Sequence, residues 1–245
     1  MGCPHWTLLV HPFLKTEAGR YLSYPMNISL FLVVLPVLLM SVVVHEVAHA
    51  LVAKWEGDDT AYRLGRVTLN PIPHLDLMGS VIVPLLLFFL PGDFIFGWAK
   101  PVPVNPRNYR DYKWGDIRVS LAGIASNLLL AVLFTLFLAV LQFLGSRAGF
   151  GGGIFSIFFQ AAFYGLYINL ILAVFNLIPI PPLDGSHVLF HLLPPGLRNR
   201  YREFGRYGIG VIMLLVFVLP DGFRLLLLPV TFLVEIALKF VEIWA

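Results

Sequence analysis

Long apolar runs separated by short polar segments dominate the chain. Three of them, at about residues 28–54, 117–143 and 154–177, exceed the roughly 20 residues that a helix needs to cross a bilayer. Two shorter apolar runs, at about 207–219 and 225–243, are predicted to form a closing helical hairpin. The pattern therefore predicts an all-α polytopic membrane protein with a three-helix core and a C-terminal helical hairpin.

The segment between the first two core helices has a different pattern. Residues 56–76 are polar with alternating apolar positions, which predicts short β-strands and a small β-sheet. Residues 79–97 are apolar but interrupted by proline and glycine, whereas residues 98–106 contain prolines that favour an extended chain. We expect 79–97 to be a re-entrant segment, buried by protein, that does not cross the membrane.

Charge gives the chain an orientation. Lysine and arginine gather in residues 54–76, 98–118 and 185–206, and such basic loops normally face the cytoplasm. Because the first two groups would then lie on one side, residues 79–97 cannot cross. We expect a multi-pass protein of the cell (inner or plasma) membrane, surrounded by the lipid bilayer.

Composition excludes several classes of function. The chain is 58% hydrophobic and 13% charged, and its net charge of +3 is too small to indicate nucleic-acid binding. Cys3 is the only cysteine, so disulfides and cysteine-ligated zinc are excluded. We expect no cleavable signal peptide, and one domain organised as an N-terminal segment (1–25), a catalytic membrane core (26–187) and a cytoplasmic loop with the hairpin (188–245).

A polar cluster interrupts the first apolar run. His45, Glu46 and His49 form an H-E-x-x-H pattern about 25 Å along the predicted helix from its start. Histidines four residues apart share a helix face and can bind one metal ion, while the glutamate can act on water at that metal. Ionisable groups at such depth are costly unless they are paired or bind an ion. The cluster predicts a metal-dependent hydrolase whose site lies toward the cytoplasmic half.

A catalytic zinc usually takes three protein ligands, so a third must come from elsewhere. Asp184 is the best candidate, because it follows the proline-interrupted end of the third span at the predicted depth of the two histidines. Its alternative role is to cap the helix that starts near Ser186. His187 and His191 are interpreted as surface residues, and His74 and Asp76 as turn or cap residues.

Together these motifs resemble the site-2 protease family of intramembrane zinc metalloproteases, in its compact prokaryotic branch without a PDZ or nucleotide-binding regulatory domain. The resemblance covers roughly residues 26–187. It is carried by H-E-x-x-H, by N-x-x-P-x-P-P-L-D-G at 176–185, and by segments 66–71, 97–106 and 120–127.

The resemblance implies an intramembrane endopeptidase that cuts transmembrane segments of other membrane proteins. One Zn²⁺ per chain would be held by His45, His49 and Asp184, with Glu46 as general base. Asn127 would donate to the oxyanion, although asparagines also bond between helices in lipid. Substrate would pair with an extended segment comprising Trp98, Lys100, Pro101, Val102, Pro103 and Val104. Implied substrates include anti-sigma factors, pro-sigma factors and remnant signal peptides.

Two alternatives remain at this stage. The chain could be a membrane zincin of another family, which would take its third ligand from a downstream helical glutamate. It could also be an inactive zinc-binding relative with a chaperone-like or transporter-like role. Such a relative would be expected to lose Glu46 or a ligand, and all four residues are present.

Overall fold

The structure is a computed structural model that describes residues 28–89, 98–148, 153–219, 222 and 225–244. The predicted N-terminal segment 1–25 and the tip of the predicted re-entrant segment (90–97) lie outside the described residues. Three described helices are long and apolar enough to cross a membrane: Ile28–Glu56, Tyr112–Arg147 and Gly153–Leu177. These three helices match the three predicted spans.

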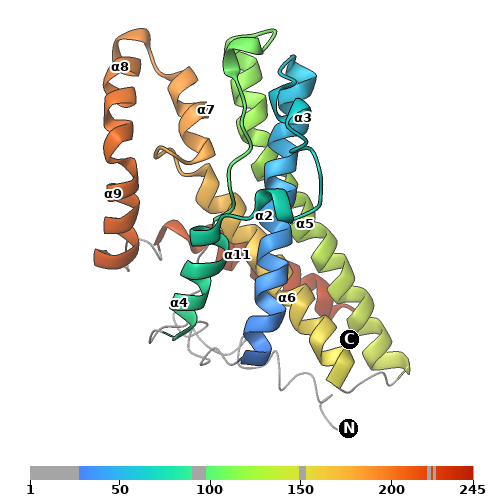
Figure 1. Cartoon of the computed structure of the whole chain (residues 1–245). Helices are drawn as coiled ribbons and strands as arrows, with labels where there is room; N and C mark the ends of the chain where they lie inside the picture. Colours follow the sequence, from blue (N-terminus) through green and yellow to red (C-terminus); the bar gives the residue numbers. More distant parts are fainter. Residues whose placement is uncertain (1–27, 90–97, 149–152, 220–221, 223–224, 245) are drawn as a thin grey trace.

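All described regular structure is helical (Figure 1). In chain order the helices are α2 (Ile28–Glu56), α3 (Thr60–Arg63), η1 (Ile72–His74), η2 (Leu77–Ile82), α4 (Val83–Phe89), η3 (Pro106–Asn108), α5 (Tyr112–Ala148), α6 (Gly153–Leu177), α7 (Asp184–Leu192), α8 (Pro195–Phe204), η4 (Gly205–Tyr207), α9 (Gly208–Met213), η5 (Leu214–Val218) and α11 (Leu228–Glu242).

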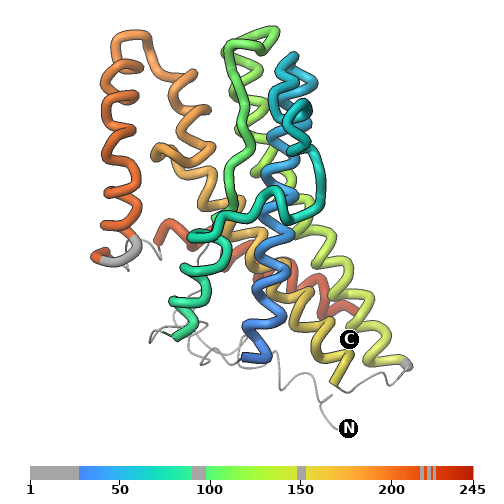
Figure 2. Tube along the Cα trace, viewed as in Figure 1, coloured from blue at the N-terminus to red at the C-terminus, as the bar shows by residue number. Residues whose placement is uncertain are grey.

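Helices α2, α5 and α6 pack pairwise into the central bundle, with α5 contacting both of the others most extensively (Figure 2). Helix α7 packs against α5 and α6 at one end of this bundle, and α8 follows α7. The main apolar core joins α5, α6 and α11, and includes the fully buried Leu138 and Ala162.

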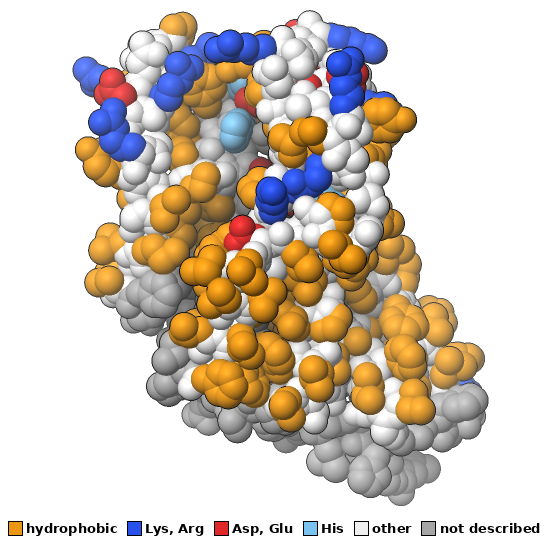
Figure 3. All heavy atoms as spheres, viewed as in Figure 1, with side chains coloured by type: hydrophobic (Ala, Val, Ile, Leu, Met, Phe, Trp, Pro, Cys, Tyr) orange, Lys and Arg blue, Asp and Glu red, His pale blue; other side chains and the backbone are white. Residues whose placement is uncertain are grey.

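The surface is consistent with a lipid environment over much of the bundle. Apolar side chains cover the lower part of the face in Figure 3, whereas lysine and arginine gather mainly at the end where α3 and α8 lie. Exposed apolar side chains such as Leu129, Phe89 and Ile154 belong to the apolar helices. A surface of this kind is stable against hydrocarbon and unstable against water.

The predicted small β-sheet is wrong, because the described residues contain no strand. The segment with alternating apolar residues forms turns in place of strands. A helical turn starts at Asp59 and Thr60, and Gly65 has a positive φ of 66°. Asn70 Oδ1 accepts a hydrogen bond from the backbone N of Ile72. In the segment that begins at 98, three prolines lack the N–H groups that a ladder needs.

The predicted C-terminal hairpin is not present as a pair of helices. Helix α11 packs against α5 and α6, whereas α9 and η5 do not pair with it along their length within the described residues. Figure 1 shows α9 following α8 on the far side of α7.

The apolar helical segment from Leu77 to Phe89 belongs to the region predicted to be re-entrant. Near its start it contacts the segment that begins at residue 98, because Trp98 N donates a hydrogen bond to Gly79 O (3.1 Å).

Asp58 ties the end of α2 to the extended segment. This buried carboxylate accepts hydrogen bonds from Thr60 (N, 3.2 Å; Oγ1, 2.5 Å), from Asn108 Nδ2 (2.8 Å) and from the backbone N of Asn105 (2.6 Å). Burial alone would raise the pKa of Asp58, but these hydrogen bonds outweigh it and hold the pKa below its usual value. The carboxylate form is therefore the one that stabilises the fold.

Asp58→Asn should lower the melting temperature, because its amide places an N–H against one of these donors. We expect a loss of about 1–3 kcal/mol at neutral pH, measured by thermal unfolding in detergent. A depressed pKa contributes stability above the unfolded-state value, about 3.9, and loses it as pH falls through the folded value. The difference from wild type should therefore shrink in acid.

Asp59→Asn is the matched control. Its carboxylate pairs on the surface with Arg63, so its loss should change stability by less than about 1 kcal/mol. Equal melting temperatures for Asp58→Asn and wild type would contradict the assignment of Asp58 as the anchor.

Candidate metal centre

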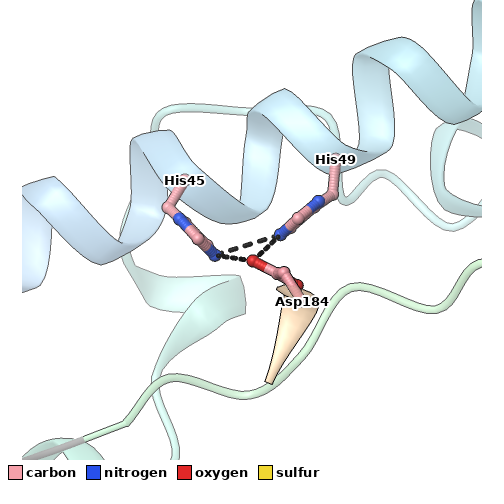
Figure 4. A group of neighbouring side chains, drawn as sticks. All are labelled: His45, His49 and Asp184. Carbon is pink, nitrogen blue, oxygen red and sulfur yellow. Dashed lines mark hydrogen bonds and ion pairs between the residues drawn. The ribbon is translucent and has the colours of Figure 1, made fainter. Parts of the chain in front are cut away.

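Two histidines of α2 and the first residue of α7 converge on one point (Figure 4). His45 and His49 are i and i+4, so helical geometry alone brings their rings to one side of α2. Their Nε2 atoms are 3.0 Å apart, and Asp184 Oδ2 lies 3.2 Å from His45 Nε2 and 3.4 Å from His49 Nε2. In the described part of the chain this is the one group of three such side chains placed to hold a metal ion.

The outer nitrogens of both rings are already bonded. His45 Nδ1 lies 2.5 Å from Asn127 Oδ1, and His49 Nδ1 lies 2.7 Å from Val119 O. A carbonyl oxygen can only accept, so the hydrogen-bond network assigns a proton to each Nδ1. In neutral rings each Nε2 then carries a lone pair directed toward Asp184.

This donor set fits a metal ion. Three acceptors face one another, and buried Asp184 Oδ2 has no hydrogen-bond partner among the described residues. Zinc bonds of about 2.0–2.2 Å in tetrahedral geometry put neighbouring donors about 3.3 Å apart, close to the observed separations. Two histidines and a carboxylate leave one position open, as in catalytic zinc sites.

Helix α5 comes unusually close to the two rings. A Cβ at Gly123 would overlap His49 Nε2 and His45 Cε1, so only glycine allows this approach. Gly185 has a similar role behind Asp184, where a Cβ would overlap the carbonyl of Leu177. The close approach brings Val119 O and Asn127 within reach of the histidines.

Asn127 is fully buried and lies in a chain of side-chain amides. Its Oδ1 faces His45, and its Nδ2 donates to Asn169 Oδ1 (2.8 Å). Asn169 Nδ2 in turn donates to Ser41 Oγ (2.8 Å) and to Gly165 O (2.8 Å). The network links α2, α5 and α6 and orients the ring of His45.

Glu46 contacts the extended segment that follows residue 97. Its Oε2 accepts a 2.7 Å hydrogen bond from the backbone N of Val102, a buried residue. The same segment is held from other sides, because Lys100 N donates to His74 O (2.8 Å) and Arg66 Nη2 donates to Lys100 O (2.8 Å). The segment is therefore held in a fixed position beside the H-E-x-x-H helix. We call its residues Trp98 and Lys100 to Val104 the rail.

The remaining predicted substrate residues lie along this rail. Trp98 is partly exposed and covers Gly79, where a Cβ would overlap its ring. Pro101 is exposed and Pro103 half-buried, while Val104 packs against the cluster that contains Ala53 and Tyr109.

Of the two residues interpreted as surface histidines, His187 is exposed and His191 is buried, and both lie beside a buried carboxylate. His187 Nδ1 is 3.2 Å and His191 Nε2 is 2.8 Å from Asp116 Oδ2. Because Asp116 precedes them by 71 and 75 residues, no local sequence pattern indicated that it contacts the two histidines. The i, i+4 spacing of the two histidines on an amphipathic helix was the one clue that they share a partner.

Comparison with known proteins places these features in a family. The profile of "Peptidase family M50" matches residues 151–219, which include Asp184. "Putative zinc metalloprotease YwhC" of Bacillus subtilis is 40% identical over 208 residues, covering 83% of this chain and 87% of that protein. "Putative zinc metalloprotease Rip2" of Mycolicibacterium smegmatis is 31% identical over 208 residues, covering 83% and 73%. No solved structure matches the chain.

Asn127→Leu should weaken metal binding. Without Asn127 Oδ1, the His45 proton can move to Nε2, and partners of this kind typically contribute 10–100-fold in metal affinity. The measurement is affinity for a divalent metal ion by competition with a chromogenic chelator. Asn176→Leu is the control, because among the described residues Asn176 Nδ2 bonds only its own helix, at Leu172 O. Equal affinities for both variants and wild type would exclude the orienting role.

Proposed function

The chain belongs to peptidase family M50, the site-2 protease family, and from this premise we propose how its residues carry out the reaction. It is a zinc-dependent intramembrane metalloprotease. The observation that carries the proposal is the convergence of two imidazole nitrogens and one carboxylate oxygen within 3.0–3.4 Å in a membrane helix bundle.

One zinc ion per chain would be held by His45, His49 and Asp184. When bound, the ion polarises water and the scissile carbonyl, which is the chemistry that a Lewis acid supplies to hydrolysis. His49 and His45 keep their lone pairs available because Val119 O and Asn127 hold the protons on the other ring nitrogens.

Glu46 would be the general base. Its carboxylate takes a proton from the attacking water and later passes it to the departing amine. The hydrogen bond from Val102 N keeps one carboxylate oxygen turned toward the rail. The side-chain amide of Asn127 bonds His45 and Asn169. These bonds support a role in positioning His45, in place of the expected hydrogen bond to the oxyanion.

The rail (Trp98 and Lys100 to Val104) would bind the substrate in extended form. A helical transmembrane segment hides its peptide bonds in i to i−4 hydrogen bonds, so it must unwind locally before water can attack. Addition of an unwound strand beside a fixed extended segment stabilises that form through backbone contacts. Contact of the rail with Glu46 supports this assignment, because it puts the bound strand next to the base.

The substrates are membrane proteins, and we propose that the cut falls inside a transmembrane segment. Anti-sigma factors, pro-sigma factors and remnant signal peptides are candidates of this kind. The site would face the cytoplasmic side of the cell membrane, since lysine and arginine side chains gather mainly at the end of the molecule where α3 and α8 lie (Figure 3).

Glu46→Gln should abolish cleavage of a model transmembrane peptide in proteoliposomes. A general base contributes about 10²–10⁴-fold, so the rate should fall by at least about a hundredfold. The variant should retain one equivalent of zinc by elemental analysis, which separates loss of the base from loss of the metal. Removal of zinc from wild type by a chelator should abolish cleavage, and zinc should restore it. Cleavage by the Glu46→Gln protein at the wild-type rate would contradict the role of Glu46 as general base.

Val102→Pro should lower kcat by removing the N–H that holds Glu46. Neighbours Pro101 and Pro103 already impose an extended chain, so the backbone tolerates the change. Hydrogen bonds to charged groups contribute about 1.5–3 kcal/mol, which predicts a loss of roughly ten- to a hundredfold. Val102→Ala retains the N–H and is the control. If both variants behave alike, side-chain packing, and not this hydrogen bond, explains the effect.

A further inference from the structure

A second polar cluster lies between α7 and the start of α5, beside the metal centre. It consists of Asp116 from the first turns of α5 and of His187 and His191 from α7. Asp116 is buried, and its Oδ2 faces a ring nitrogen of each histidine. Both histidines therefore donate to one carboxylate oxygen.

The two histidines differ in exposure. His191 is 2% exposed, and its ring packs edge-on against Tyr112 and Phe190, so it can hold Asp116 in place without contacting substrate. His187 has half of its side chain exposed. The one hydrogen bond of its ring within the described residues is the Nδ1 contact to Asp116, so Nε2 has no hydrogen-bond partner there.

His187 is adjacent to the metal-binding carboxylate. It follows Asp184 by three residues on α7, and side chains at this spacing lie on one helix face about 5–6 Å apart. The charges of Asp184 and His49 are close enough to act on its ring. Among the described histidines, His187 has the most exposed side chain.

We propose that His187 is a catalytic residue of this protease, whose Nε2–H donates a hydrogen bond to the scissile carbonyl oxygen as it becomes an oxyanion. Asp116 is the positioning residue that fixes the ring through Nδ1. No proton is transferred: the imidazolium keeps both of its protons while negative charge develops and disappears opposite it. The proposal rests on the proposed function and adds an electrophile to it.

The electrostatics of the cluster support this role. The hydrogen bond to Asp116 is the main cause that raises the pKa of His187 above its usual value. A hydrogen-bond donor that is held in place beside developing negative charge in a site with little water lowers the barrier more than it would in water. Asn127, whose amide is committed to His45 and Asn169, leaves this role open.

The test compares His187→Ala and His187→Gln with wild type in the full-length protein, by cleavage of a model transmembrane peptide in proteoliposomes. Loss of one oxyanion donor lowers kcat by about 10²–10³-fold, and we expect a fall of this size for alanine with KM little changed. Glutamine, which retains a neutral donor, should recover part of the rate. Asp116→Asn should lower kcat less than His187→Ala.

Arg200→Ala is the control for loss of positive charge, because Arg200 is exposed on α8. It should leave kcat unchanged. Zinc content and melting temperature are measured on each variant, and the glutamine variant serves if the alanine variant does not fold. The proposal is overturned if His187→Gln and wild type share the same kcat, if only KM changes, or if the loss of rate follows a loss of zinc. Wild type that fails to outpace Glu46→Gln would instead overturn the proposed function.

Discussion

Three lone pairs that face one another inside a membrane helix bundle are the constraint on which the rest of the structure depends. Two neutral imidazole nitrogens and a carboxylate oxygen within 3.4 Å repel one another unless a cation lies between them. Each partner must therefore be held from behind. His49 is held by a carbonyl of α5, His45 by an amide of α5, and Asp184 by a turn that requires Gly185.

The same residues that hold the histidines also join the spans. In lipid, helices associate through close packing and polar contacts, because apolar side chains gain little by leaving hydrocarbon. Gly123 supplies the close contact between α5 and α2, and the chain Asn127–Asn169–Ser41 supplies the polar one across all three helices. Orientation of a ligand and cohesion of the bundle thus come from one network, so a change in either should affect the other.

Local patterns in the sequence predicted the spans, the H-E-x-x-H helix and the aspartate placed with it. They failed where partners are distant in the chain or where turns compete with strands. The alternating residues after 60 predicted strands, but side chains of Asp58, Thr68 and Asn70 take up the backbone donors nearby. The partner of His187 and His191 lies on another helix, and the packing of α11 on α5 and α6 depends on surfaces that no local pattern reveals.

A single hydrogen bond, from Val102 N to Glu46, connects the rail to the proposed general base. Pro101 and Pro103 have no N–H group, so Val102 N is the one backbone donor among residues 101–103, and it donates to Glu46. Arg66 and His74 fix the neighbouring Lys100, and Asp58 fixes Asn105, so the rail cannot slide along α2. A strand that binds to it is therefore placed in a defined register relative to Glu46. Because that register is set by the enzyme backbone, the position of the cut should depend on where a substrate helix unwinds more than on its side chains.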